Sequence, residues 1–203
     1  MKLLLYIGLF LFAAQGEEVP IKDKDAFIKK FDEVSENTTS IQCSFVQNKY
    51  LSFSKEPLKS EGKLYFENEK MRWEQTSPKP YLMVIKDEVL KIKEDGEIKE
   101  HKLGDNKYMK GLKEIMMGSM TGNLLNSDQF DTELFENDAH WIVKMVPKAK
   151  RLKKMFSQVK MNFNRETYRM EFVTLSESNG DYTRIEFLDP IFNKEIDQQL
   201  FEL

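Results

Sequence analysis

The residue types that most often perform catalysis occur in this chain, but their spacing forms no recognisable catalytic or metal site. The two histidines, His101 and His140, lie far apart in strand-like runs, without the H-E-x-x-H or Cys/His spacing that binds zinc. The sequence also lacks a G-x-S-x-G nucleophile elbow and a glycine-rich phosphate loop. The 34 acidic residues leave a hydrolase open as an alternative. No catalytic residue, metal ligand or cofactor is predicted, and we expect a protein that is not an enzyme.

The clearest pattern in the sequence suits removal of an apolar ligand from water. Between residues 41 and 92, apolar and polar residues alternate in short segments separated by polar turns, which is typical of strands. Successive side chains of a strand point to opposite faces, so the apolar members of each segment share one face. This face is predicted to form one continuous lipid-binding interior lined by Phe45, Leu64, Phe66, Trp73, Met83, Ile85, Leu90 and Ile92.

The elements that must position these side chains are mainly strands. Glycine tolerates the positive φ of tight hairpin turns, so Asp95-Gly96 and Asn179-Gly180 predict two hairpins. About ten or eleven strands are expected in total, and a strongly twisted sheet of that size usually curls or closes. The sequence therefore predicts a mainly β fold with helices, an incomplete antiparallel β-barrel. Its later strands are expected near residues 130–135, 140–146, 158–163, 168–175 and 182–188.

A helix is predicted immediately before the first of these strands. In segment 23–37 an apolar stripe containing Phe27, Ile28 and Phe31 recurs with helical spacing, and an aspartate in the first turn can cap it. The helix is expected to lie across one face or mouth of the sheet. Its stripe could pack as ordinary core or contact a ligand.

A methionine-rich segment separates the two blocks of strands. Met116, Met117 and Met120, with Met109 before them, lie among several glycines, and methionine suits surfaces that accept apolar partners of varied shape. We interpret the segment as a helical lid whose Met116, Met117 and Met120 bind lipid. A buried helix that uses methionine as filler is the alternative.

A dense cluster of basic residues follows the strand predicted at 140–146. It could dock the protein onto an acidic partner surface, because long-range attraction raises association rates, or it could be a solvated turn. Leu152 and Phe156 could add an apolar anchor at its centre. The cluster consists of Lys148, Lys150, Arg151, Lys153 and Lys154.

The N-terminus reads as an export signal. Residues 1–16 combine an early positive charge, a short apolar core and small residues before a plausible cleavage site, whereas a membrane span needs about 20 apolar residues. Residues 17–203 are long enough for one domain and are predicted to form a single domain. The net charge of −3 and the interspersed charges do not favour nucleic acid, and Cys43, the only cysteine, has no disulfide partner within the chain.

Three short sequence patterns carry a family resemblance. Ser44-Phe45-Val46-Gln47, then Gly62-Lys63-Leu64, then Arg72-Trp73 followed by Pro78 or Pro80 are similar to the F-x-Q, G-x-L and RW-x-x-x-x-P series of the periplasmic outer-membrane lipoprotein carrier (LolA-type) family. The resemblance extends through Asp181–Phe187 to Phe192-Asn193 and covers nearly the whole mature chain. It implies that residues 17–203 form a single lipoprotein-carrier-like domain, with the same open barrel and with helices as a lid.

The resemblance also implies a function. It implies a periplasmic carrier that shields the acyl chains of lipoproteins, takes them from an inner-membrane release transporter and passes them to an outer-membrane acceptor, as a monomer without cofactor. Some family members place an arginine in the turn before the Trp strand, where this chain has Asn68, so Arg72 is the candidate for a polar contact between lid and barrel. A periplasmic binding module or sensor for a glycolipid or other apolar ligand is the alternative.

Overall fold

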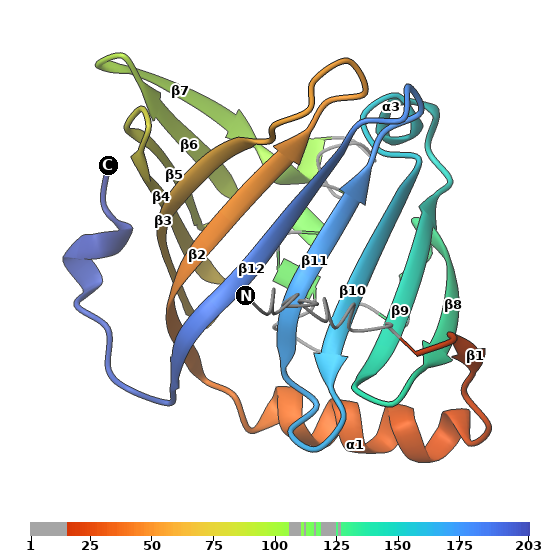
Figure 1. The fold of residues 1–203 in the computed structure, drawn as a ribbon. Coiled ribbons are helices and arrows are strands. Elements are labelled where there is room, and N and C mark those ends of the chain that lie inside the picture. Colours follow the sequence, from red (N-terminus) through yellow and green to blue (C-terminus); the bar gives the residue numbers. More distant parts are fainter. Residues whose placement is uncertain (1–15, 106–110, 112, 116, 119–124, 126) are drawn as a thin grey trace, which may run out of the picture.

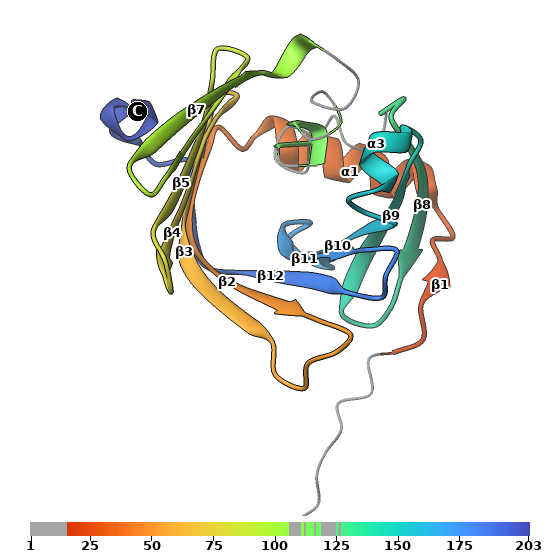
Figure 2. The same cartoon turned by 90° about the horizontal axis from the view of Figure 1, so that it is seen from above.

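The dominant element of the protein is one large antiparallel sheet. The structure, a computed structural model, describes residues 16–203 except 106–110, 112, 116, 119–124 and 126. Within these residues, twelve strands pair in the order β1-β8-β9-β10-β11-β12-β2-β3-β4-β5-β6-β7. The sheet curls strongly but stays open between its edge strands β1 and β7 (Figures 1 and 2). The predicted mainly β, incompletely closed antiparallel barrel is confirmed.

The strands follow the alternation seen in the sequence, with one addition. The addition is β1. It was not predicted, because two residues that include a proline are too few to show a period of two. The strands are β1 (Val19–Pro20), β2 (Ser40–Tyr50), β3 (Leu58–Glu67), β4 (Lys70–Ser77), β5 (Tyr81–Lys86), β6 (Val89–Glu94), β7 (Glu97–Lys102), β8 (Phe130–Glu136), β9 (His140–Pro147), β10 (Gln158–Asn164), β11 (Met170–Ser176) and β12 (Tyr182–Phe192).

The two halves of the sheet join between strands that are distant in sequence. β12 pairs with β2 over most of its length, with Phe187 opposite Phe45, and a register shift follows Leu188. Elsewhere in the sheet, neighbouring strands are consecutive in the sequence, apart from β1 and β8. The Asp95-Gly96 turn joins β6 to β7, and both residues have positive φ, as a tight hairpin turn requires.

The helix α1 (Lys24–Glu36) lies across one end of the strands, at the bottom of Figure 1. Its first turn is capped by Asp23, whose Oδ1 accepts a hydrogen bond from the Ala26 amide at 3.0 Å. Phe27 and Phe31 are buried, and Phe31 meets Phe163 of β10 edge-to-face with ring centroids 5.1 Å apart. The apolar stripe therefore packs mainly as core.

Two inner clusters of buried side chains fill the curved sheet, and a third lies outside it. One inner cluster joins α1 to β8–β12, and the other lies against β2–β6 and includes Leu103 of the short helix η1 (Leu103–Asp105). On the outer face, the C-terminal helix η2 (Gln198–Phe201) buries Phe201 near Val84 of β5 (Figure 2). None of the helices in the described residues has the length and apolar character needed to cross a membrane.

Candidate functional site: an apolar cavity

An apolar cavity of about 360 Å³ lies on the inner side of the sheet. This volume falls in the range of small-molecule binding sites, about 300–1,000 Å³. Strands β3 to β6 line one side and β10 to β12 line the other, so the cavity lies between the two halves of the sheet. Of the eight predicted interior residues, five line it: Leu64, Trp73, Met83, Leu90 and Ile92. The other three, Phe45, Phe66 and Ile85, are buried in the surrounding core at 1–3% exposure.

The wall of the cavity depends on a close contact at Gly62. Phe45 of β2 lies opposite Gly62 of β3 and stacks on Trp73 of β4, with ring centroids 3.8 Å apart. A Cβ atom on Gly62 would stand 2.6 Å from the Phe45 ring, so only glycine leaves room for it. The glycine in the G-x-L pattern thus allows the Phe45–Trp73 stack that supports the cavity.

The second half of the sheet contributes lining residues that the sequence reasoning did not name. Met161, Val173, Leu175 and Ile185 face the cavity from β10, β11 and β12. Their alternation is the same signal that identified the residues of β3 to β6. What the alternation alone could not show was that both halves face one space, since this follows from the pairing of β12 with β2.

One end of the cavity is polar. Gln47, Gln75 and Tyr81 line it where β2, β4 and β5 approach the same end of the sheet. The Gln75 amide donates a hydrogen bond to the Lys79 carbonyl oxygen at 2.8 Å. Burial, with a smaller contribution from the charge of Glu94, raises the pKa of Tyr81, so its hydroxyl stays neutral at physiological pH.

Two described residues between β7 and β8, Ile115 and Met117, pack inside the curved sheet. Met117 is 2% exposed and packs among side chains of β3 to β6, while Ile115 lines the cavity itself. Gly111 approaches α3 (Lys150–Lys153) so closely that a Cβ there would stand 2.3 Å from Leu152. Met116 and Met120, also predicted as lipid contacts, lie outside the described residues.

Arg72 does not occupy the position expected of a residue that ties lid to barrel. Met71 and Trp73 face inward, so Arg72 points to the outer face. Its Nη1 donates a hydrogen bond to the carbonyl oxygen of Leu200 at 3.0 Å, and its Nε donates to Glu74 at 2.9 Å. Arg72 therefore fastens the C-terminal segment to the outside of the sheet.

The predicted docking cluster is exposed, but its proposed apolar anchor is not available. All five basic residues are exposed, three of them belong to α3, and Lys148 lies 3.4 Å from Asp131 in an ion pair. Leu152 is fully buried against the core, and Phe156 is partly buried beside it. The anchor prediction was wrong because these two apolar residues hold α3 onto the barrel.

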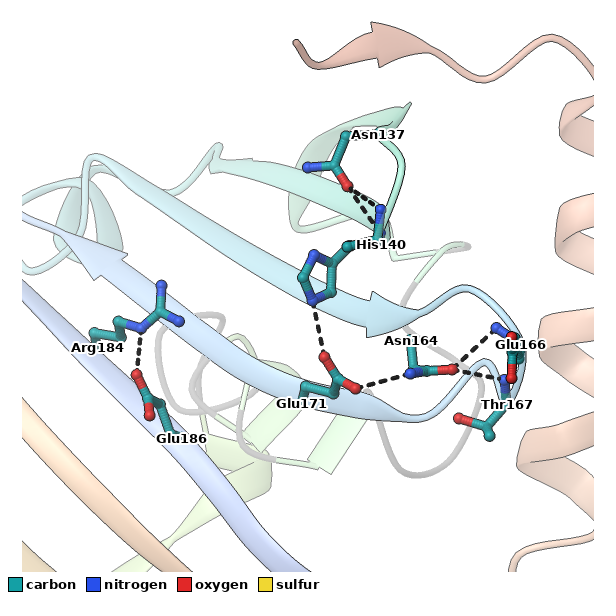
Figure 3. A network of polar contacts seen from close by, with 9 residues as sticks. Asn137, His140, Asn164, Glu166, Thr167, Glu171, Arg184 and Glu186 are labelled. Carbon is teal, nitrogen blue, oxygen red and sulfur yellow. Dashed lines mark hydrogen bonds and ion pairs between the residues drawn. The ribbon is translucent and has the colours of Figure 1, made fainter. Parts of the chain in front are cut away.

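Polar side chains of β9, β10, β11 and β12 form hydrogen bonds and ion pairs on the outer face (Figure 3). His140 Nε2 lies 2.8 Å from Glu171, and Asn164 donates to the other oxygen of that carboxylate at 2.9 Å. Arg184 pairs with Glu186 at 2.7 Å. Across the described part of the chain, no three His, Cys, Asp or Glu side chains are grouped so that they could hold a metal ion.

Comparison of the sequence with protein families assigns the chain to one of them. Residues 36–203 match the model of the outer membrane lipoprotein carrier protein LolA, so the chain belongs to this family and the predicted resemblance is confirmed. This is a family of carrier and binding proteins whose members are not known as enzymes. No protein of curated function matches the sequence significantly.

Solved structures with similar folds have distant sequences. A conserved protein from Thermus thermophilus is 9% identical with a TM-score of 0.54, covering 88% of this chain and 92% of that one. A LolA superfamily protein from Nitrosomonas europaea is 9% identical with a TM-score of 0.47, covering 88% and 96%. The MucA/MucB complex of Pseudomonas aeruginosa contains a chain that is 13% identical with a TM-score of 0.47, covering 88% and 60%. At such low identity, the likeness to the Thermus protein supports the fold alone.

Proposed function

We propose that the protein carries the acyl chains of lipoproteins in its cavity and delivers them toward the outer membrane. The observation that carries this proposal is the apolar cavity between the two halves of the sheet, in a chain of the lipoprotein carrier family. Such a carrier binds its cargo by removing the acyl chains from water, which requires no cofactor.

The size of the cavity limits how tightly an acyl chain can bind, and a carrier must bind its cargo weakly enough to release it. Each buried methylene contributes about 0.8 kcal/mol, so ten methylenes would contribute about 8 kcal/mol. Loss of translational and rotational freedom opposes binding by about 4 kcal/mol or more. The balance of about 4 kcal/mol or less corresponds to a dissociation constant in the millimolar range or weaker for a chain of ten methylenes, which suits a protein that must release its cargo.

Loading of longer or additional chains would require Leu103 and Met117, which lie between β7 and β8, to give up their present contacts. Leu103 and Met117 are almost completely buried against Leu64, Leu90 and neighbouring side chains, where they occupy space that an acyl chain could fill. An incoming chain would replace their contacts with contacts of the same apolar kind. This exchange would lower the net gain from binding and so help release.

The location and partners follow from the same proposal. The predicted export signal at residues 1–16 would place the mature protein in the periplasm, between an inner-membrane release transporter and an outer-membrane acceptor. The exposed basic cluster at Lys148, Lys150, Arg151, Lys153 and Lys154 would provide the docking surface.

A pair of matched variants tests the proposed role of the cavity. Ile92 lines the cavity, whereas Ile98 of the edge strand β7 is 48% exposed. Ile92→Asp should weaken binding of a diacylated cysteine peptide at least tenfold, because a carboxylate next to an apolar chain loses hydration. Ile98→Asp should bind like the wild type. Binding can be followed by the emission of Trp73, which lines the cavity.

The outcomes of this experiment separate the alternatives. Failure of the wild type to bind any acylated peptide would contradict the proposal. Equal binding by Ile92→Asp and Ile98→Asp, with both variants folded, would show that acyl chains bind elsewhere on the protein.

A further inference from the structure

A second, smaller pocket of about 50 Å³ adjoins the apolar cavity near the end of α1. Leu64, Met170 and Phe187 line both spaces, so the two are neighbours. The small pocket also contains Arg169, which precedes β11, and Ser35 and Thr38 from the end of α1. The cavity has the size of a chain, and the pocket has the size of a head group.

The Arg169 side chain is not satisfied by the described part of the protein. Its Nη1 atom is buried there without a hydrogen-bond partner, and no described carboxylate forms an ion pair with it. One face of the guanidinium stacks on Phe192, 3.3 Å from the ring centroid, which fixes its orientation. Partial burial lowers the pKa of Arg169, because it takes part of the guanidinium out of contact with water.

An unpaired buried donor with a positive charge costs free energy, and an anion is the partner that compensates it best. A guanidinium matches a carboxylate in shape and can donate two parallel hydrogen bonds to it. The small volume of the pocket leaves room for such a planar group.

We propose that the protein binds a single-chain fatty acid whose carboxylate pairs with Arg169 in the small pocket and whose hydrocarbon chain extends into the apolar cavity. This inference rests on the proposed function in that it takes the cavity as an acyl-chain site. It adds a free anionic lipid as a ligand and gives the site a direction, with the charged end beside α1 and the tail toward β4 and β5. A fatty acid bound in this way competes with the acyl chains of a lipoprotein.

The test compares dodecanoate with methyl dodecanoate at pH 8, where the acid is ionised and the ester has the same chain without a charge. The wild type should bind dodecanoate at least tenfold more tightly than the ester, as expected for a charge-assisted hydrogen bond. Arg169→Gln should reduce this preference to about one, and Arg169→Lys should retain part of it. Arg184→Gln is the matched control, because Arg184 stacks on Phe172 at 3.7 Å on the outer face and pairs with Glu186 (Figure 3).

Each outcome bears on a different claim. Equal binding of acid and ester by the wild type would overturn the head-group inference while leaving the acyl carrier in place, and this comparison does not depend on the folding of a variant. Failure of both ligands to bind would contradict the proposed function itself. An unchanged preference in Arg169→Gln would show that another group selects the acid. Competition by acetate at the concentration of dodecanoate would overturn the two-part site, since it would show that the chain is not needed.

Discussion

Substitution of Gly62 by alanine tests the packing that supports the cavity. Gly62 is buried and lies opposite Phe45, and a Cβ there would stand 2.0 Å from the carbonyl oxygen of Glu74 and 2.6 Å from the Phe45 ring. The carbonyl belongs to the backbone of β4, which cannot move without disturbing its pairing with β3 and β5. The ring could turn only by losing its stack on Trp73.

The expected cost follows from these two clashes. Overpacking of a well-packed interior usually costs about 1–3 kcal/mol. For a chain of this length, each kcal/mol lowers Tm by about 2–4 °C, so Gly62→Ala should melt about 2–12 °C below the wild type. Thermal unfolding followed by circular dichroism measures the difference. The emission of Trp73 should change as well, because its contact with Phe45 must adjust.

Gly104 provides the matched control for this substitution. No atom lies within 4 Å of the position that a Cβ on Gly104 would take, and its φ is not positive, so Gly104→Ala should leave Tm unchanged or raise it slightly. A Gly62→Ala variant that melts with the wild type would refute the reasoning, because it would show that the strands separate at little cost.

Two further predictions concern the buried thiol and the basic cluster. Burial raises the pKa of Cys43 to about 12 from 9.0, so above pH 9 the unfolded chain loses the thiol proton first and the folded state loses stability. Urea unfolding measures the free energy of unfolding at pH 8 and pH 10. Between these two pH values it should fall by about 1.4 kcal/mol more in the wild type than in Cys43→Ala. Equal decreases in the two proteins would contradict the buried, protonated thiol. Reversal of Lys148, Lys150 and Lys153 to glutamate should slow delivery to acceptor membranes several-fold and leave binding of a soluble acylated peptide unchanged, and added salt should slow the wild type. A delivery rate that responds to neither charge reversal nor salt would show that the cluster has no docking role and is only a solvated turn.

The strands could be predicted from the sequence because their inner faces are continuously apolar. The alternation of Leu64 and Phe66, or of Leu90 and Ile92, appears within a few residues and needs no long-range information. β1 could not be predicted, since two residues carry no periodicity and their pairing with β8 is set by the rest of the sheet.

The details of the site depended on contacts between distant segments. In the sequence Leu152 stands between Arg151 and Lys153 and looks exposed, but the fold buries it against Gly111. The outward position of Arg72 does follow from the alternation of β4, whereas its partner, the Leu200 carbonyl, is far away in sequence. Arg169 gave no signal, because a single arginine before a strand is usually solvated, and only the arrangement of α1, β2 and β12 around it encloses its guanidinium.

The central claim is that an acyl chain occupies the cavity while the protein is in its native compartment. Native mass spectrometry of the protein isolated gently from its own cells tests this claim most directly. The account predicts a fraction of molecules that carry acylated cargo, lost in Ile92→Asp and retained in Ile98→Asp. Protein that is always free of lipid, or that retains the same lipid in Ile92→Asp, would contradict it.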